Sequence, residues 1–169
     1  SHLFKLPTTG LRFFTVYGPW DRPDMALQLF ADSIMNNKPI KLFYHGKHKR
    51  DFTYIDDIIE GINKVIFKPA SSNNDWNPTN PIASSSSAPY RIYNIGNNKM
   101  VELEKYVNIL EKELGKTAKR KLLPMQSGDV EDTFADVKDL IDDFDYSPNT
   151  SVELGIKKFV SWYKSYYKM

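Results

Sequence analysis

Residues 11–25, LRFFTVYGPWDRPDM, constrain the fold more than any other stretch of this sequence. The stretch opens with an apolar run, rich in aromatic and β-branched side chains, that is typical of a strand covered on both faces: Leu11, Phe13, Phe14, Val16 and Tyr17. Gly18 and Pro19 end the run, and Pro23 suits the first turn of a helix. We therefore expect a strand, a turn and a helix, with the turn at the carboxyl edge of a sheet, where open α/β folds bind ligands.

Helix and strand signals alternate along the rest of the chain, which predicts the α/β class. We expect helices over residues 24–36 and 101–114, strands at 40–44, 50–55, 91–96 and 120–123, a helix after residue 55 capped by Asp56 or Asp57, and a last helix with a capping box of Thr150 and Glu153. The inward faces of the second and last helices are expected to be formed by Ile58, Ile62, Val65 and Ile66, and by Val152, Ile156, Phe159, Tyr163 and Tyr166.

Residues 68–89, KPASSNNDWNPTNPIASSSSAP, carry most of the low-complexity character of the chain. A connection of this length is either a functional lid or a mobile insertion. Because it contains one aromatic residue and almost no aliphatic ones, we expect a flexible insertion that lies away from any ligand.

The composition excludes several classes of function. A net charge of +2 is too small to argue for nucleic acid, and the basic runs 47–50 and 116–121 are short enough to be solvated surface. The chain has no cysteine and only three scattered histidines, which argues against a metal site. No apolar run approaches the roughly 18 residues that span a bilayer. We expect a cytoplasmic protein that binds neither nucleic acid nor membrane.

Thr15 and Arg22 flank the predicted turn and are the first candidates for ligand binding. A hydroxyl group and a planar guanidinium are suited to an anionic, polyhydroxylated ligand, because Arg can bind a carboxylate or phosphate through two parallel hydrogen bonds. Without a wider context, a capping Thr and a solvated Arg explain the same residues.

Three motifs in order supply that context: the stretch 11–25, RDFTYIDDIIEGI at 50–62 and QSGDVEDTFAD at 126–136. Together they resemble the carboxyl-terminal half of an NAD-dependent nucleotide-sugar epimerase of the extended short-chain dehydrogenase/reductase superfamily, and are most similar to the UDP-glucuronate 4-epimerase group. The resemblance covers nearly the whole chain apart from residues 68–89. It implies the last parallel strands of a Rossmann-type sheet together with a small mixed α/β substrate-binding domain.

The resemblance also implies that residues 1–169 are a single fragment, the substrate-binding portion of a longer enzyme. The chain has neither a G-x-G-x-x-G loop nor a Tyr-x-x-x-Lys pair, which in this family hold NAD and supply the general base. We therefore expect the NAD-binding portion to lie upstream, no catalytic residue in this chain, and no epimerase activity from the chain alone. Only the backbone near Phe13 is expected to contact NAD.

The family motifs assign substrate contacts to several positions of this chain. Arg50 matches the residue that binds the nucleotide diphosphate, and Asp129 matches the carboxylate that binds the ribose hydroxyls. Leu42 and Phe43 fall where the family forms its uracil slot. A surface ion pair of Arg50 with Asp51 and a core position for Phe43 remain the alternatives.

Thr15 and Gln126 separate this chain from the galactose-epimerase pattern, which has Asn and Arg at these positions. Both residues are usual in the uronate-epimerase group, which favours a glucuronate-type sugar with Arg22 bound to its carboxylate. Asp21 departs from the family, which commonly has Gly there, and could pair with Arg22.

The reaction implied is C4 inversion of a UDP-sugar, UDP-glucuronate to UDP-galacturonate, through a 4-keto intermediate with NAD as oxidant and reductant. The full-length protein is expected to be a homodimer. Two alternatives remain: a nucleotide-sugar dehydratase or decarboxylase of the same superfamily, and a binding module that never had a cofactor domain.

Overall fold

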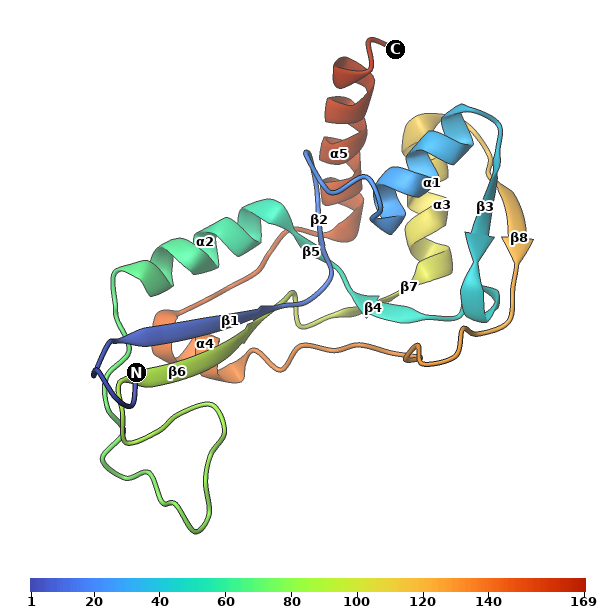
Figure 1. Cartoon of the computed structure of the whole chain (residues 1–169). Helices are drawn as coiled ribbons and strands as arrows, with labels where there is room; N and C mark the ends of the chain where they lie inside the picture. Colours follow the sequence, from blue (N-terminus) through green and yellow to red (C-terminus); the bar gives the residue numbers. More distant parts are fainter.

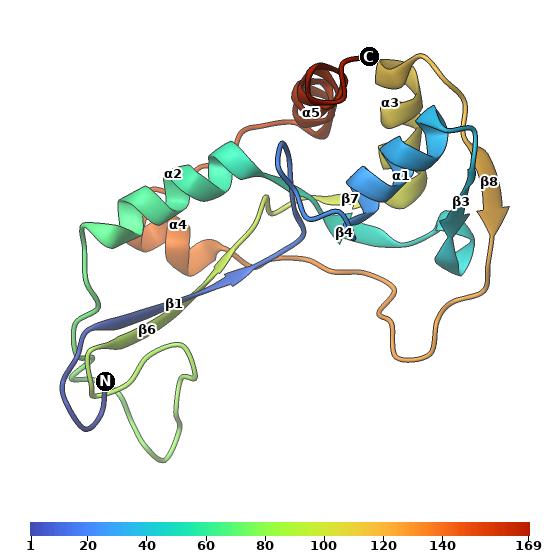
Figure 2. The same ribbon diagram turned by 45° about the horizontal axis from the view of Figure 1, so that its top comes forward.

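The computed structural model describes all 169 residues and divides them into two lobes (Figures 1 and 2). One, the sheet lobe, contains β1 (Thr8–Phe13), β6 (Tyr90–Ile95), α2 (Ile55–Ile66) and α4 (Lys138–Phe144). The other, the helical lobe, contains α1 (Ala26–Met35), α3 (Leu103–Leu114), α5 (Val152–Tyr166), β3 (Pro39–Leu42), the 3₁₀ turn η1 (Phe43–Gly46) and β8 (Lys119–Leu122). The expected α/β class is confirmed.

The sheet lobe is built on a parallel pair of strands from distant parts of the chain. β1 pairs with β6 in a register that sets Thr8 opposite Tyr90 and Phe13 opposite Ile95. The helices α2 and α4 pack together beside this pair, around a cluster of eight buried residues. Two carboxyl strand ends, at Phe13 and Ile95, therefore point the same way, toward the helical lobe.

The helical lobe has the larger core, a cluster of 19 buried residues. The predicted spacing of apolar residues in α3 buries Val107, Leu110 and Leu114, and Gly115 ends the helix in the left-handed conformation with φ 74°. β3 and β8 form a second parallel pair at the outer edge of this lobe. The helices α1, α3 and α5 are held together by this core.

Short strands and one buried carboxylate join the lobes. β2 (Val16–Tyr17) pairs with β5 (Thr53–Tyr54), and β4 (Lys49–Asp51) pairs with β7 (Met100–Glu102). The carboxylate of Asp51 accepts hydrogen bonds from the backbone N–H groups of Asn97, Asn98 and Ala135, at 2.8, 3.0 and 3.1 Å. Burial raises the pKa of Asp51, and these hydrogen bonds oppose the shift.

Several expected elements differ in detail from the observed ones. The predicted strand 11–17 is two strands, and Phe13 is 54% exposed rather than covered. Neither α4 nor β7 was expected. Ile66 and Tyr166 were predicted to be buried but are 61% and 52% exposed, because each lies in the last turn of its helix beyond the core.

Both predicted helix caps in this part of the chain are wrong, for one shared reason. The cap of α5 is Ser151, whose hydroxyl group accepts from the N–H of Leu154 at 3.2 Å. Thr150 instead donates its hydroxyl hydrogen to Asp57 at 3.0 Å. Asp57 lies in the first turn of α2, which starts after Tyr54 without a side-chain cap. The carboxylate that could cap α2 therefore fixes the start of α5.

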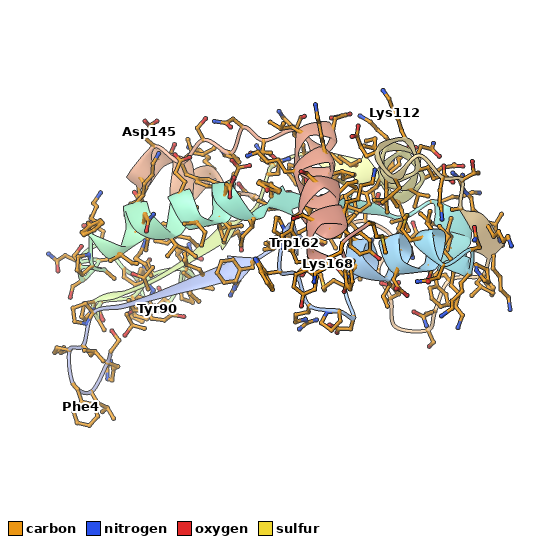
Figure 3. All side chains as sticks on the ribbon, turned by 90° about the horizontal axis from the view of Figure 1, so that it is seen from above. Phe4, Tyr90, Lys112, Asp145, Trp162 and Lys168 are labelled. Carbon is orange, nitrogen blue, oxygen red and sulfur yellow. The ribbon has the colours of Figure 1, made fainter.

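Residues 68–89 form no helix or strand and extend from the far end of the sheet lobe (Figure 1). Isolated bridges between Ser72 and Pro89, and between Ser85 and Arg91, hold the two ends of the segment. The exposed Phe4 lies at the same end of the molecule (Figure 3). No helix of the protein combines the length and apolar character needed to cross a bilayer.

Candidate functional site

A cavity of about 440 Å³ lies between α1, β3 and the chain that follows β3. Its lining is mainly apolar with a few polar groups: Ala26, Leu29, Phe30, Ser33, Pro39, Ile40, Lys41, Phe43, His48, Leu103 and Asp129. Apolar walls with a small number of placed polar groups are typical of sites for flat organic ligands. Two of the predicted site residues, Phe43 and Asp129, meet in this cavity.

The turn η1 determines which side chain after β3 faces the cavity. Tyr44 and His45 have left-handed backbone conformations, with φ 50° and 53°, and Gly46 follows with φ 80°. This reversal brings the chain back into β4 and leaves Phe43 half-buried at the cavity wall. Leu42, by contrast, is 1% exposed in the core, and its carbonyl oxygen accepts from the N–H of Leu123 at 2.9 Å. The side chain of Leu42 therefore belongs to the core and does not reach the cavity.

Arg50 and Asp129 contact each other directly, although 79 residues separate them in the chain. Arg50 Nη2 lies 3.1 Å from Asp129 Oδ1 and 2.9 Å from the carbonyl oxygen of Val130. Arg50 Nη1 donates to the carbonyl oxygens of Lys49 and Glu131, at 3.0 and 2.8 Å. The guanidinium thus fixes residues 129–131 against β4. These four contacts use the N–H groups of Nη1 and Nη2, and the N–H of Nε remains without a partner among them.

The alternative to a ligand contact was a salt bridge of Arg50 with Asp51 or a similar neighbour, and the pair with Asp51 is not formed. Asp51 points into the junction between the lobes, while Arg50, the next residue back along the strand, points to the opposite side. The partner of Arg50 is Asp129, whose side chain is 31% exposed beside the 18% exposed side chain of Arg50.

His48 also contacts Asp129 and was not among the predicted residues. Its side chain is 5% exposed, and Nε2 lies 3.2 Å from Asp129 Oδ2, without the alignment of a hydrogen bond. Nδ1 lies 3.1 Å from the carbonyl oxygen of Glu131. The sequence contained one signal for this contact: His48 directly precedes β4, and residues two apart in extended chain share a face, which favours placing His48 on the same side as Arg50.

Gln126 opens the turn that carries Asp129. The N–H of Asp129 donates to the carbonyl oxygen of Gln126 at 3.2 Å, and Gly128 has φ 83°, a conformation that few other residues adopt. The side chain of Gln126 is exposed and lies outside the cavity lining.

Thr15, Arg22 and Phe13 lie outside the cavity lining. The carbonyl oxygen of Thr15 accepts from the N–H of Thr53 at 2.9 Å, which places Thr15 between β1 and β2. The side chain of Arg22 is 73% exposed and pairs with Asp24 at 3.2 Å. Asp21 accepts only from the backbone N–H of Arg22, so the expected side-chain pair of Asp21 and Arg22 is not formed.

This arrangement suits a ligand with a flat ring, hydroxyl groups and negative charge. Phe43 offers an aromatic face, Asp129 offers a carboxylate that can accept from two vicinal hydroxyls, and Arg50 and Lys41 supply positive charge. For a dinucleotide such as NAD the chain offers less. Phe13, whose backbone is the expected contact, lies at the carboxyl end of β1, the edge of open α/β sheets at which ligands bind.

A second cavity, of about 360 Å³, lies at the opposite end of β6 and has a largely polar lining that includes Arg91, Asp143 and residues 68–73. None of the predicted site residues reaches it. Its polar groups bond to one another: Arg91 Nη2 donates to Asp143 Oδ2 at 2.8 Å, and Lys68 donates to the Asp143 carbonyl oxygen at 3.0 Å.

Known proteins are similar to nearly the whole of this chain. Residues 1–96 match the model of the NAD dependent epimerase/dehydratase family. The chain is 52% identical over 168 residues to protein CapI of Staphylococcus aureus, covering 99% of this chain and 50% of CapI. It is 46% identical over 170 residues to a probable UDP-glucuronate 4-epimerase of Rhizobium meliloti, covering 99% of this chain and 50% of that protein.

Among solved structures, the fold matches that of the UDP-glucuronic acid 4-epimerase from Bacillus cereus in complex with UDP-glucuronic acid and NAD. The TM-score is 0.79 at 31% sequence identity, and the match covers 98% of this chain and 48% of that one. The chain therefore spans about half the length of the curated relatives it matches.

Proposed function

Because this chain belongs to the NAD dependent epimerase/dehydratase family, we propose that it forms the UDP-sugar-binding portion of an epimerase that converts UDP-glucuronate to UDP-galacturonate. The observation that carries the proposal is the cavity lined by Phe43 and Asp129, together with Arg50, which forms an ion pair with Asp129. In this proposal residues 1–169 bind the substrate, and an upstream portion binds most of the cofactor.

The residues of the cavity have distinct proposed tasks. Phe43 stacks against the uracil ring, and Asp129 accepts hydrogen bonds from the ribose hydroxyls. Arg50 contacts the diphosphate through Nε–H. When the substrate binds, other N–H groups of the guanidinium leave the carbonyl oxygens of the loop and donate to the diphosphate instead. Leu42 acts only through its position beneath Phe43, and Gln126 through the turn that carries Asp129.

NAD, when bound, supplies the oxidation and reduction at the sugar C4. In this chain Phe13 is the residue proposed to contact it, from the carboxyl end of β1. Thr15, two residues further on, is proposed to face the sugar from the same edge. These residues orient ligands and do not transfer protons, because the Tyr-x-x-x-Lys pair that supplies the general base in this family is absent from the sequence.

Arg22 is the proposed partner of the sugar carboxylate, which only a uronate possesses. Its side chain is exposed and held by a single exposed carboxylate, Asp24. Surface ion pairs of this kind contribute little, so Arg22 is free to exchange Asp24 for a ligand.

Two assays test the proposal. Incubation of the full-length gene product with UDP-glucuronate should give UDP-galacturonate, while the 169-residue chain alone should turn over no UDP-sugar. Formation of a 4,6-dehydrated or decarboxylated sugar would show that the protein catalyses another reaction of the same family and would contradict the proposed epimerisation.

Two arginine variants separate the roles by calorimetry with UDP and UDP-glucuronate. Arg50→Ala should weaken binding of both ligands on the order of a hundredfold, because both carry the diphosphate. Arg22→Ala should weaken only UDP-glucuronate. Arg12→Ala, an exposed arginine on β1, is the matched control. If Arg22→Ala still prefers UDP-glucuronate to UDP as strongly as the unaltered protein does, Arg22 does not bind the sugar carboxylate.

A further inference from the structure

The buried imidazole of His48 faces an oxygen atom on each side. Nδ1 lies 3.1 Å from the carbonyl oxygen of Glu131, and Nε2 lies 3.2 Å from Asp129 Oδ2. With a side chain that is 5% exposed, His48 has no water to take the place of either oxygen. The proposed function as set out above gives this residue no task.

The surroundings of Glu131 determine which ring nitrogen carries hydrogen. The Glu131 carbonyl oxygen already accepts from the N–H of Lys49 at 3.2 Å and from Arg50 Nη1 at 2.8 Å, and a carbonyl can only accept. Nδ1 must therefore be a donor. In the neutral imidazole Nε2 then carries a lone pair that faces the Asp129 carboxylate, which is repulsive. Only the imidazolium form donates toward both oxygens.

We propose that His48 is a positioning residue for nucleotide binding, and that its protonated form holds Asp129 and residues 129–131 in the geometry that binds the ribose. The inference rests on the proposed function and deepens it. Arg50 Nη2 and the N–H of Val130 donate to Oδ1 of the Asp129 carboxylate, at 3.1 and 2.8 Å, and the positive charge of a protonated His48, whose Nε2 lies 3.2 Å from Oδ2, attracts the other oxygen. Loss of the His48 proton removes this attraction and loosens the loop.

The charged and titratable groups around His48 act in both directions. Asp129 favours the imidazolium, whereas Lys49 and Arg50 on β4, and Lys41 across the cavity, oppose it. The ring of Tyr44 in η1 lies against the imidazole with 5.3 Å between ring centroids, and α3 contributes Leu103. Because the favoured contact needs the proton, the loop is held at low pH and released as pH rises through the titration of the imidazole.

The test is calorimetry of UDP-glucuronate binding to the full-length protein between about pH 5.5 and 8, the range in which histidine titrates. This ligand is preferred to UDP because its diphosphate is a diester without an ionisation in that range. Affinity of the unaltered protein should fall roughly threefold to tenfold as pH rises, the size of one partly exposed charge-assisted contact. His48→Gln should bind as weakly at low pH as the unaltered protein does at high pH.

His45→Gln is the matched control, since His45 lies three residues away on the exposed side of η1 and should leave the pH dependence unchanged. A merely structural role of His48 would weaken binding by the same factor at every pH. That result, or an equal pH dependence in His48→Gln, overturns the inference.

A second readout needs no ligand. Nitrogen NMR of the histidine rings should show His48 carrying hydrogen at Nδ1, and Asp129→Asn should change the ring signals of His48 while those of His45 stay in place. If UDP-glucuronate fails to bind at any pH, the proposed function fails, and NMR still decides whether His48 and Asp129 are coupled. If it binds and the NMR coupling is absent, the inference alone fails.

Discussion

The helical lobe and the sheet lobe differ in how completely each encloses its own core. The helical lobe surrounds 19 buried residues with three helices and a strand pair, whereas the sheet lobe has eight, beside only two strands (Figure 1). Phe13, Leu3 and Phe4 are exposed at or near β1. Since a two-stranded sheet is marginally stable alone, the sheet lobe depends on the helices packed beside it and on its contacts with the larger core of the helical lobe.

The candidate site follows the same division. The cavity lies in the helical lobe, but Asp129 belongs to the extended segment that runs from β8 to α4 and so connects the two lobes (Figure 1). One wall of the cavity is therefore formed by regular elements, α1 and β3, and the other by an extended segment whose Asp129 contacts Arg50 and His48.

The strongest test of the comparison is a cavity in the helical core. Ile156 on α5 is fully buried, so Ile156→Ala should lower the free energy of unfolding by about 2–5 kcal/mol. Leu154→Ala, on the same helix and 47% exposed, should cost far less. Chemical denaturation of both variants, with hydrogen exchange to locate the loss, measures the difference. Equal losses in the two variants would mean that α5 is not part of a self-contained core.

Asp51 tests the connection between the lobes. Asp51→Asn replaces one carboxylate oxygen with an amide N–H group that faces backbone N–H donors, which should cost about 1–3 kcal/mol. Hydrogen exchange should rise at Asn97, Asn98 and Ala135 in particular. Asp56→Asn is the control, because Asp56 is exposed and contacts only Lys158. Protection that is unchanged at all three amides would show that Asp51 does not join the lobes.

Asp143 provides a weaker test, confined to the sheet lobe. Burial by itself would raise the pKa of Asp143, but hydrogen bonds from Tyr93 and Arg91 lower it below its usual value. The lowered pKa contributes stability above the unfolded-state titration, and this stability is lost as pH falls through the folded-state pKa. Asp143→Asn should therefore cost less than about 1 kcal/mol at pH 7.

The thermal midpoints of Asp143→Asn and of the unaltered protein should converge as the solution is acidified. Asp139→Asn, which removes a longer contact to the same arginine at 3.9 Å, is the comparison variant and should have the smaller effect. If the difference in thermal midpoint between Asp143→Asn and the unaltered protein widens toward low pH, the pKa of Asp143 is not lowered in the folded state.

The smallest effect is expected from the segment beyond the sheet lobe. No residue from 74 to 83 is buried, and the backbone bond from Asn73 N–H to the Ser86 carbonyl oxygen, at 3.0 Å, closes the segment at its base. Replacing residues 75–83 with two glycines should change the free energy of unfolding by less than about 1 kcal/mol, because loop-closure entropy varies slowly with length. Their amides should exchange within the shortest labelling time; strong protection there would indicate a lid.

The sequence by itself determined most of the longer helices and strands and their order, although not α4 or β7. The three- and four-residue spacing of Val107, Leu110 and Leu114 is enough to define α3, and Gly115 is enough to end it. The strand-turn-helix pattern of residues 11–25 likewise predicted β1 and β2, the turn at Gly18 and the helix α1. These features depend on interactions within a few residues, which a sequence displays directly.

Only the tertiary structure decided which distant residues share a site. Arg50 and Asp129 were predicted to bind different parts of one ligand, yet they bind each other, and His48 joins them across 81 residues from Asp129. The same holds for Asp57, which was one of two residues expected to cap α2, with Asp56 the other, and which instead accepts a hydrogen bond from Thr150. A carboxylate accepts hydrogen bonds from whichever donors the packing of the lobes brings near it. That choice depends on contacts between segments far apart in the chain, and no local pattern records it.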